Sequence, residues 1–139
     1  MNKVSFSVIA FAVMVLIGTG FDYLIHGILY RFGLQYYDSW FWISQVLYFL
    51  FYQAVIWVLF YFNRNVYFLI LTQAFVLTAT QDIVFFGLWS NGVFPKGQWT
   101  WMLYYKLFGS WTTEIQLWVS FIGLQVASWL CLAVNRVRS

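Results

Sequence analysis

Long apolar runs dominate this chain and leave it few possible folds. Four predominantly apolar stretches follow one another within 139 residues, at about 4–30, 40–62, 66–89 and 113–134. A helix of about 20 such residues crosses the ~30 Å hydrocarbon core of a bilayer. Closed barrels need many short alternating strands, a pattern that this sequence lacks. The sequence therefore predicts an all-α membrane protein. We expect a single domain over residues 1–139, with four transmembrane helices in an antiparallel bundle.

The composition agrees with a membrane location and narrows the possible partners. Hydrophobic residues make up 63% of the chain and charged residues only 8%, whereas about 25% of the residues in a soluble domain are charged. The seven Lys and Arg residues are scattered and form no basic stripe, which argues against a nucleic-acid partner. We expect the lipid bilayer, and other membrane subunits or a second copy of the chain, to be the partners.

The connections between the spans predict a topology. Residues 63–65 alone join the second and third spans, so these spans should form a tight hairpin. An even number of spans places both termini on one side of the membrane. That side holds four cationic residues and the other holds three, namely Lys3, Arg64, Arg136 and Arg138 against Arg31, Lys96 and Lys106. Because Lys and Arg concentrate in cytoplasmic loops, this bias predicts a multi-pass protein with cytoplasmic termini.

The connection between the third and fourth spans differs from the other two. It is too short to cross the bilayer, yet it is rich in aromatic residues, and Trp and Tyr favour the headgroup level. We expect a short interfacial helix at about 98–108. Four aromatic residues are its predicted anchors: Trp99, Trp101, Tyr104 and Tyr105.

Polar residues from all four spans recur at one depth. A rise of 1.5 Å per residue places them about 24–32 Å from the terminus side, just below the opposite interface. They are Asp22 and His26 in the first span, Gln45 in the second, Asp82 in the third, and Glu114 and Gln116 in the fourth. Asp38 shares a helix face with Gln45. The sequence therefore predicts a polar layer to which every helix contributes.

Helix faces explain how this layer can converge. Gly18, Asp22 and His26 follow one another at four-residue spacing, so they share one face. In the fourth span a 3,4,3,4 pattern of small and polar residues predicts the face that packs against other helices; it comprises Thr113, Gln116, Ser120, Gly123 and Ala127. Nearer the midplane, Gln53 and Gln73 are expected to form interhelical hydrogen bonds.

Three interpretations of the layer are open. Asp22, His26, Asp82 and Glu114 are hard ligands suited to one divalent metal ion, such as iron, manganese or zinc. Alternatively, carboxylates beside an imidazole can handle protons. In the third interpretation the layer is structural, because polar side chains this close to the interface can reach water.

Three functions follow, in order of preference. The first is an accessory or structural subunit of a larger membrane complex, because the spans are apolar nearly all round and little chain lies outside them. The alternative is a stand-alone membrane enzyme or lipid-binding protein that uses the polar layer as its site. Its reaction is unassigned, because the sequence has no nucleophile-elbow, phosphate-loop or zinc-protease motif. The third is a small oligomeric channel or exchanger, although the polar stripe fades beyond Gln53 and Gln73.

Overall fold

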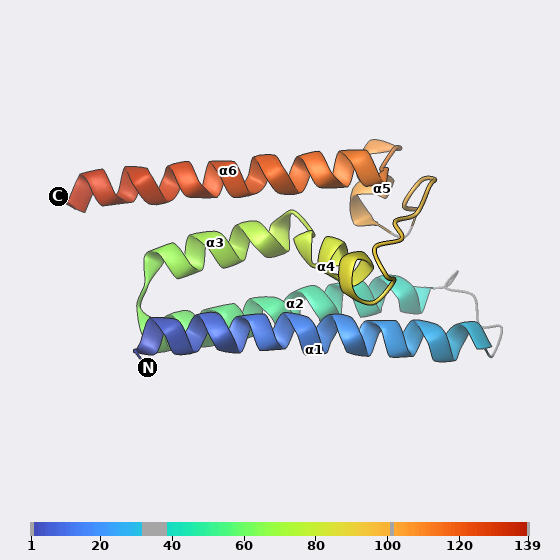
Figure 1. The fold of residues 1–139 in the computed structure, drawn as a ribbon, viewed down its shortest axis with the longest axis horizontal. Helices are drawn as coiled ribbons and strands as arrows, with labels where there is room; N and C mark the ends of the chain where they lie inside the picture. The colour runs from blue at the N-terminus through green and yellow to red at the C-terminus, as the bar shows by residue number, and fades with distance from the viewer. Residues whose placement is uncertain (1, 32–38, 101, 139) are drawn as a thin grey trace.

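The computed structural model describes residues 2–31, 39–100 and 102–138, with side chains described outside 25–31, 39–45 and 138. Almost all of this part of the chain is helical, and it contains no strand. The helices are α1 (Lys3–Arg31), α2 (Ser39–Asn63), α3 (Val66–Leu77), α4 (Thr80–Leu88), α5 (Leu103–Phe108) and α6 (Thr113–Arg138). Their arrangement is shown in Figure 1.

The long helices have the length and composition of membrane spans. Stretches of 22 residues in α1, 18 in α2 and 25 in α6 are apolar enough to cross a bilayer. The pair α3–α4 passes the same test only if the two helices count as one span. In lipid a helix satisfies its backbone hydrogen bonds within itself, which is why apolar runs of this length adopt it. The described chain therefore has three such spans, or four with the bent pair.

The third apolar stretch is the one place where the predicted helix is wrong. An unbroken helix over 66–89 was expected, but the helix stops at Leu77 and restarts at Thr80, and the axes of α3 and α4 differ by 71°. Ala79 adopts a left-handed conformation at the break, with φ 53°. The sequence has neither Gly nor Pro at this point. The bend could therefore not be predicted from a residue that usually breaks a helix.

A tight turn joins α2 to α3, as the three-residue connection predicts. Arg64 takes a positive φ of 54°, and the two asparagines beside it hold the turn. The Asn63 side chain accepts a hydrogen bond from the Asn65 amide at 2.7 Å, and the Asn65 side chain caps α3 by accepting one from the Phe68 amide at 3.0 Å. This cap satisfies a backbone donor that the start of a helix leaves free.

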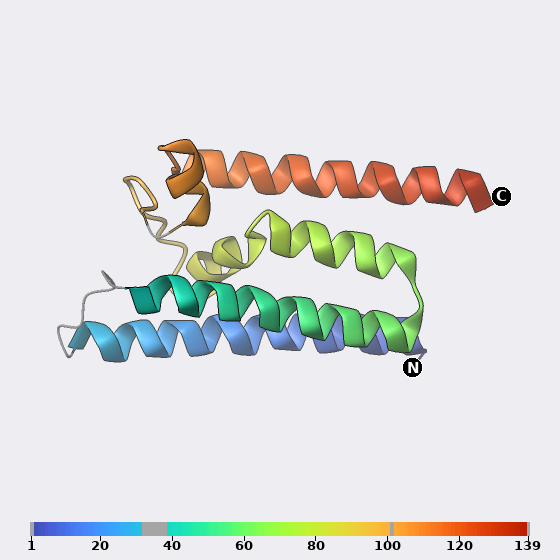
Figure 2. The ribbon, with the colours of Figure 1, turned by 180° about the vertical axis from the view of Figure 1, so that it is seen from behind.

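Three layers of helix are visible from both sides of the molecule. The α3–α4 pair lies between α6 on one side and the α1–α2 pair on the other (Figures 1 and 2). Both termini lie at the end of the molecule where α2 turns into α3. The connection around α5 lies at the opposite end. We refer to these as the terminal end and the α5 end.

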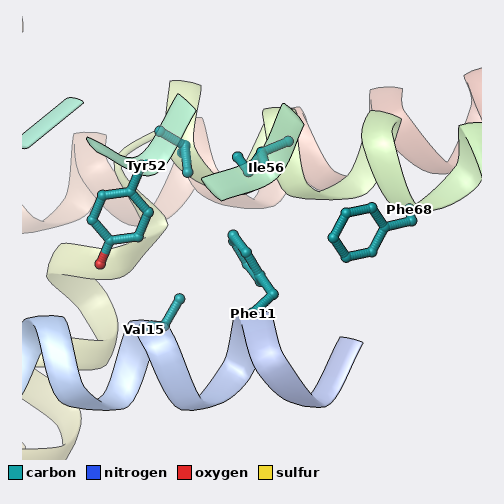
Figure 3. Packing of buried hydrophobic residues seen from close by; sticks show 6 residues of the cluster. Phe11, Val15, Tyr52, Ile56 and Phe68 are labelled. Atoms are coloured by element: carbon teal, nitrogen blue, oxygen red, sulfur yellow. The ribbon is translucent and has the colours of Figure 1, made fainter. Parts of the chain in front are cut away.

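The first core lies between α1, α2 and α3. Figure 3 shows Phe11 and Val15 of α1 pointing toward Tyr52 and Ile56 of α2, with Phe68 of α3 beside them. Phe11 meets Phe68 edge-on, with ring centroids 6.2 Å apart. Since lipid is as apolar as these side chains, close packing rather than water exclusion holds such helices together.

A second core forms at the α5 end and is made largely by the connecting chain. It comprises Ala79, Trp99, Met102 and Trp111. The short helix α5 falls inside the segment in which an interfacial helix was expected, and it ends at Gly109 with φ 74°. This second core packs against the break between α3 and α4, because Ala79 is one of its members.

Candidate functional site

Gly18 of α1 packs directly against two tyrosine hydroxyl groups of α2. A Cβ atom built at Gly18 would lie 3.0 Å from the hydroxyl oxygen of Tyr48 and 3.1 Å from that of Tyr52. Both distances are tighter than ordinary contacts, so a larger residue would push the two tyrosines away. The missing side chain therefore lets two hydroxyl groups of α2 pack directly onto the backbone of α1.

Tyr48 and Tyr52 form a hydrogen-bonded pair on α2. They stand four residues apart, on one face of the helix, with hydroxyl oxygens 3.2 Å apart and ring centroids 4.9 Å apart in an edge-on arrangement. Tyr52 is only 1% exposed. A buried hydroxyl requires a hydrogen-bond partner, and the pairing provides one for each tyrosine.

Two carboxylates from different helices act on this pair. Asp22 of α1 and Asp82 of α4 both interact electrostatically with the hydroxyl groups of Tyr48 and Tyr52. Asp82 lies in the first turn of α4, where the helix dipole favours negative charge. Two phenols and two carboxylates from α1, α2 and α4 thus lie within electrostatic range of one another, and we call these four residues the Tyr–Asp cluster. Phenols can donate a proton and carboxylates can accept one.

Trp89 fixes α4 against α1 near this cluster. Its indole nitrogen donates a hydrogen bond to the Thr19 hydroxyl at 3.0 Å, and its ring lies so close to Gly20 that a Cβ there would be 2.7 Å from it. The ring also stacks on Tyr23, with centroids 6.2 Å apart. Because α4 carries Asp82, these contacts hold that carboxylate on the side of α1.

Gln116 of α6 is the centre of a second polar network, which surrounds the break between α3 and α4. Its amide nitrogen donates to the carbonyl oxygens of Thr78 at 2.7 Å and Ala79 at 3.1 Å. Its amide oxygen accepts a hydrogen bond from the Trp111 indole at 2.8 Å, and Gln116 is 0% exposed. Backbone carbonyls released by a helix break need such partners inside a membrane, so Gln116 stabilises the bent conformation.

The connecting chain joins this network through further hydrogen bonds. The Trp99 indole donates to the Thr113 hydroxyl at 3.1 Å, and that hydroxyl donates to the Pro95 carbonyl at 2.7 Å. Tyr104 donates its hydroxyl to the carbonyl of Leu77, the last residue of α3. Burial raises the pKa of Tyr104 above its usual range. The connection between α4 and α6 is therefore tied to the end of α3 and to the start of α6.

The structure brings some of the predicted polar layer together. Asp22 and Asp82 share the Tyr–Asp cluster, whereas Gln116 belongs to the second network. Glu114, at the start of α6, is exposed. The side chains of His26 and Gln45, and Asp38 as a whole, lie outside the described residues. The convergence of the complete layer stays a prediction.

The metal hypothesis is likewise untested. Among the described side chains, no three His, Cys, Asp or Glu residues gather where they could hold a metal ion. His26 was the predicted nitrogen ligand, and its side chain lies outside the described residues. A site built from Asp22, His26, Asp82 and Glu114 therefore stays a prediction.

The four aromatic anchors have different surroundings. Trp99 is 0% exposed within the second core, so in this structure it packs inside the protein. Tyr104 and Tyr105 are half-buried and pack against that core, and Trp101 lies outside the described residues. Their predicted position at the membrane interface is not tested by these contacts.

Several residues of these networks were not predicted from the sequence as members of a site. The i, i+4 spacing of Tyr48 and Tyr52 beside the Gln45 stripe was a visible signal for the tyrosine pair. Trp111 and Thr78 carried no comparable signal, since their roles depend on the unpredicted break. No known protein family, curated protein or solved structure matches the chain, so the site rests on its own geometry.

Proposed function

We propose that the protein is a small accessory or structural subunit of a larger membrane complex. In this proposal it spans the bilayer four times as an antiparallel bundle, with both termini in the cytoplasm and α5 at the opposite interface. The observation that carries the proposal is the exposure of α6. Only 11% of the most apolar window of α6 is buried in the protein, compared with 28% for α1.

The exposed side of α6 has the composition of a protein interface. Trp118 is 65% exposed and Trp129 is 70% exposed, and large aromatic residues are the commonest anchors of protein–protein contacts. The same side carries further large apolar residues, namely Phe121, Ile122 and Val126. We call this set of five residues the α6 face.

The accessible surface of the whole molecule agrees with an incomplete assembly. It measures 9646 Å², whereas a compact globular protein of 16.5 kDa exposes roughly 7,500 Å². The excess follows from helices that are covered on one side only. Lipid can cover such surfaces, but a partner helix would pack the aromatic side chains of the α6 face more closely.

Extraction from the native membrane tests this proposal. We expect the chain to be recovered in nanodiscs or mild detergent with partner subunits in fixed stoichiometry, measured by native mass spectrometry. Replacing Trp118 and Trp129 together by Ala should release the partners. Trp57→Ala, on an exposed face of α2, is the matched control and should retain them. Recovery of the unmodified chain as a monomer with lipid alone would refute the subunit proposal.

A second candidate function is a proton-transfer site, and the Tyr–Asp cluster favours it. In this proposal a protonated carboxyl group on one side donates a proton to the hydroxyl pair, while the pair donates a proton to the carboxylate on the other side, so that one proton passes between α1 and α4. Infrared spectroscopy of the protein in nanodiscs should show the broad O–H absorption of shared protons. This absorption should be lost in Asp22→Asn or Asp82→Asn and kept in Glu114→Gln. An unchanged spectrum in both aspartate variants would exclude this function.

The metal version of the same site has a separate test. If Asp22, His26, Asp82 and Glu114 bind a divalent ion, the purified chain should contain about one equivalent of iron, manganese or zinc by elemental mass spectrometry. His26→Ala and Asp22→Asn should each lower the metal content, whereas Gln125→Ala, on the exposed surface of α6, should not. A metal-free and stable chain would leave the proton-transfer hypothesis as the alternative.

A further inference from the structure

An open groove lies between α3 and α6 at the terminal end of the molecule. Its volume is about 540 Å³, and it is lined by Tyr67 and Leu71 of α3 and by Ser128, Cys131, Leu132 and Asn135 of α6. It lies more than one helix turn beyond the contacts of Gln116 and Ser120, which hold the other half of α6. The groove is therefore separate from both polar networks.

The polarity of the groove changes with depth. The outer limit of the groove is its end nearest the two termini. There, the Tyr67 hydroxyl donates a hydrogen bond to the Asn135 side chain at 3.4 Å. Deeper in, the lining is apolar, with Leu71, Cys131 and Leu132. The Ser128 hydroxyl donates a hydrogen bond to the Leu124 carbonyl of its own helix, α6, at 2.8 Å. Seven residues separate Ser128 from Asn135, so the groove extends about 10 Å along α6. An amphiphile fits such a gradient, with its polar group at the outer limit.

Three cationic residues lie at the same end of the molecule as the outer limit of the groove. Arg136 directly follows Asn135, and Arg64 precedes Tyr67 by three residues, with its guanidinium 4.3 Å from the centre of the Tyr61 ring. Lys3 lies at the same end, 5.3 Å from the centre of the Phe62 ring. The acidic residues in the described part of the chain, Asp22, Asp82 and Glu114, belong to the half nearer the α5 end. The positive charge of the described residues at this end therefore favours a negatively charged ligand at the groove.

We propose that this groove binds one anionic phospholipid. One acyl chain lies along Leu71 and Leu132, and the headgroup phosphate lies at the level of Asn135, between Arg64 and Arg136. Basic pockets between membrane helices are known to recognise anionic headgroups, and long Arg side chains reach the headgroup level by extending along the helix. The inference requires only that α3 and α6 lie in the bilayer. It does not depend on the subunit proposal or on the Tyr–Asp cluster.

Native mass spectrometry of the full chain in detergent tests the proposal directly. Phosphatidylglycerol and phosphatidylcholine with identical acyl chains are added in turn. We expect one phosphatidylglycerol molecule to be retained, with an affinity about 10- to 30-fold above that of phosphatidylcholine. Arg64→Gln combined with Arg136→Gln should remove most of this preference while leaving weak binding of both lipids.

Filling the groove distinguishes it from the rest of the apolar surface. Leu71→Trp should abolish retention of either lipid, and Ser128→Phe provides a second variant if the first fails to fold. Leu130→Trp adds similar bulk at an exposed position of α6 that belongs neither to the groove nor to the α6 face, and it should leave retention unchanged.

Four outcomes would overturn the lipid site. They are equal retention of the two lipids, retention in both groove-filled variants, binding of inorganic phosphate as tight as that of the lipid, and a dimer of the chain that Leu71→Trp dissociates. The last outcome would assign the groove to a second copy.

Discussion

The two cores of this protein are built in different ways, and the difference follows from the backbone around them. The first core lies between regular helices, and its members are mainly hydrocarbon side chains such as Phe11, Ile56 and Phe68. The second core lies where the chain is bent or irregular, and its Trp99 and Trp111 side chains donate hydrogen bonds as well as packing.

The comparison shows what irregular backbone requires at membrane depth. A helix satisfies its own backbone groups, so the first core can be almost purely apolar. At the break, the carbonyl of Thr78 is released from the helix, and Gln116 donates a hydrogen bond to it. Gln116 also donates to the Ala79 carbonyl, which accepts a second hydrogen bond from the Asp82 amide at 3.0 Å. We therefore expect the first core to respond mainly to changes in volume and the second mainly to changes in hydrogen bonding.

The largest expected effect is that of Gln116→Leu. This change nearly keeps the volume of the side chain but removes the Gln116 partner of the Thr78 carbonyl and of the Trp111 indole, whereas the Ala79 carbonyl keeps its bond from the Asp82 amide. At about 1–3 kcal/mol for each of these two buried groups, we expect a loss of about 2–6 kcal/mol in the free energy of unfolding. Gln125→Leu, on the exposed surface of the same helix, is the control and should have almost no effect. Unfolding in mixed detergent micelles measures both, and a loss below about 1 kcal/mol would refute the role of Gln116.

The next effect belongs to the first core. Ile56 is 0% exposed, so Ile56→Ala should leave a cavity and lower the free energy of unfolding by about 2 kcal/mol. Val58→Ala, at an exposed position on the same helix, should change it by less than about 0.5 kcal/mol. If Ile56→Ala were as harmless as Val58→Ala, the first core would not depend on close packing.

A smaller effect is expected for the one reciprocal hydrogen-bonded pair between described helices of the first core. Gln53 and Gln73 exchange two hydrogen bonds, at 3.0 and 2.7 Å. Gln53→Leu should cost about 1 kcal/mol, in the range measured for interhelical hydrogen bonds in membranes. The double variant with Gln73→Leu should recover much of this loss, because no amide is then left unpaired. A double variant that is worse than the sum of the single variants would contradict this account.

The smallest effect concerns alkaline pH and the second core. Because burial raises the pKa of Tyr104, its contribution to stability is complete below the unfolded value of about 10 and is lost as pH rises through the folded value. Tyr104→Phe should cost about 0.5–1.5 kcal/mol at neutral pH, from the lost hydrogen bond to Leu77. It should also make the stability less sensitive to pH above about 10. Equal alkaline sensitivity in both proteins would rule out Tyr104 as the titrating group.

The regular half of the molecule was predictable from the sequence, and the bent half was not. The lengths of the apolar stretches predicted α1, α2 and α6. The 3,4,3,4 pattern of small and polar residues predicted the face of α6 on which Gln116, Ser120 and Ala127 are buried. The amide pair of Gln53 and Gln73 was also expected, and its hydrogen bonds confirm it. These features depend on helix periodicity, which a single sequence displays.

The break at Thr78 and Ala79 depends on tertiary contacts that the sequence does not display. Ala favours a helix, and its left-handed conformation costs about 1–2 kcal/mol. That cost is offset by hydrogen bonds from Gln116, which lies 37 residues further along the chain from Ala79. The candidate site depends on tertiary contacts as well: Asp22 and Asp82 were proposed together from depth and helix face, but the packing of Tyr48 and Tyr52 onto Gly18 became visible only once the helices were placed.

The long separation between Ala79 and Gln116 also has a consequence in time. Ribosomes add about 5–20 residues per second, so Gln116 is synthesised roughly 2–7 seconds after Ala79, with which it shares a hydrogen bond across 37 residues. During that interval the growing chain contains the 66–89 segment without the amide that stabilises its bend. The apolar run can enter the membrane as one straight helix and bend only when α6 arrives. The bent shape of α3 and α4 is then a late event in biogenesis, set by the arrival of α6.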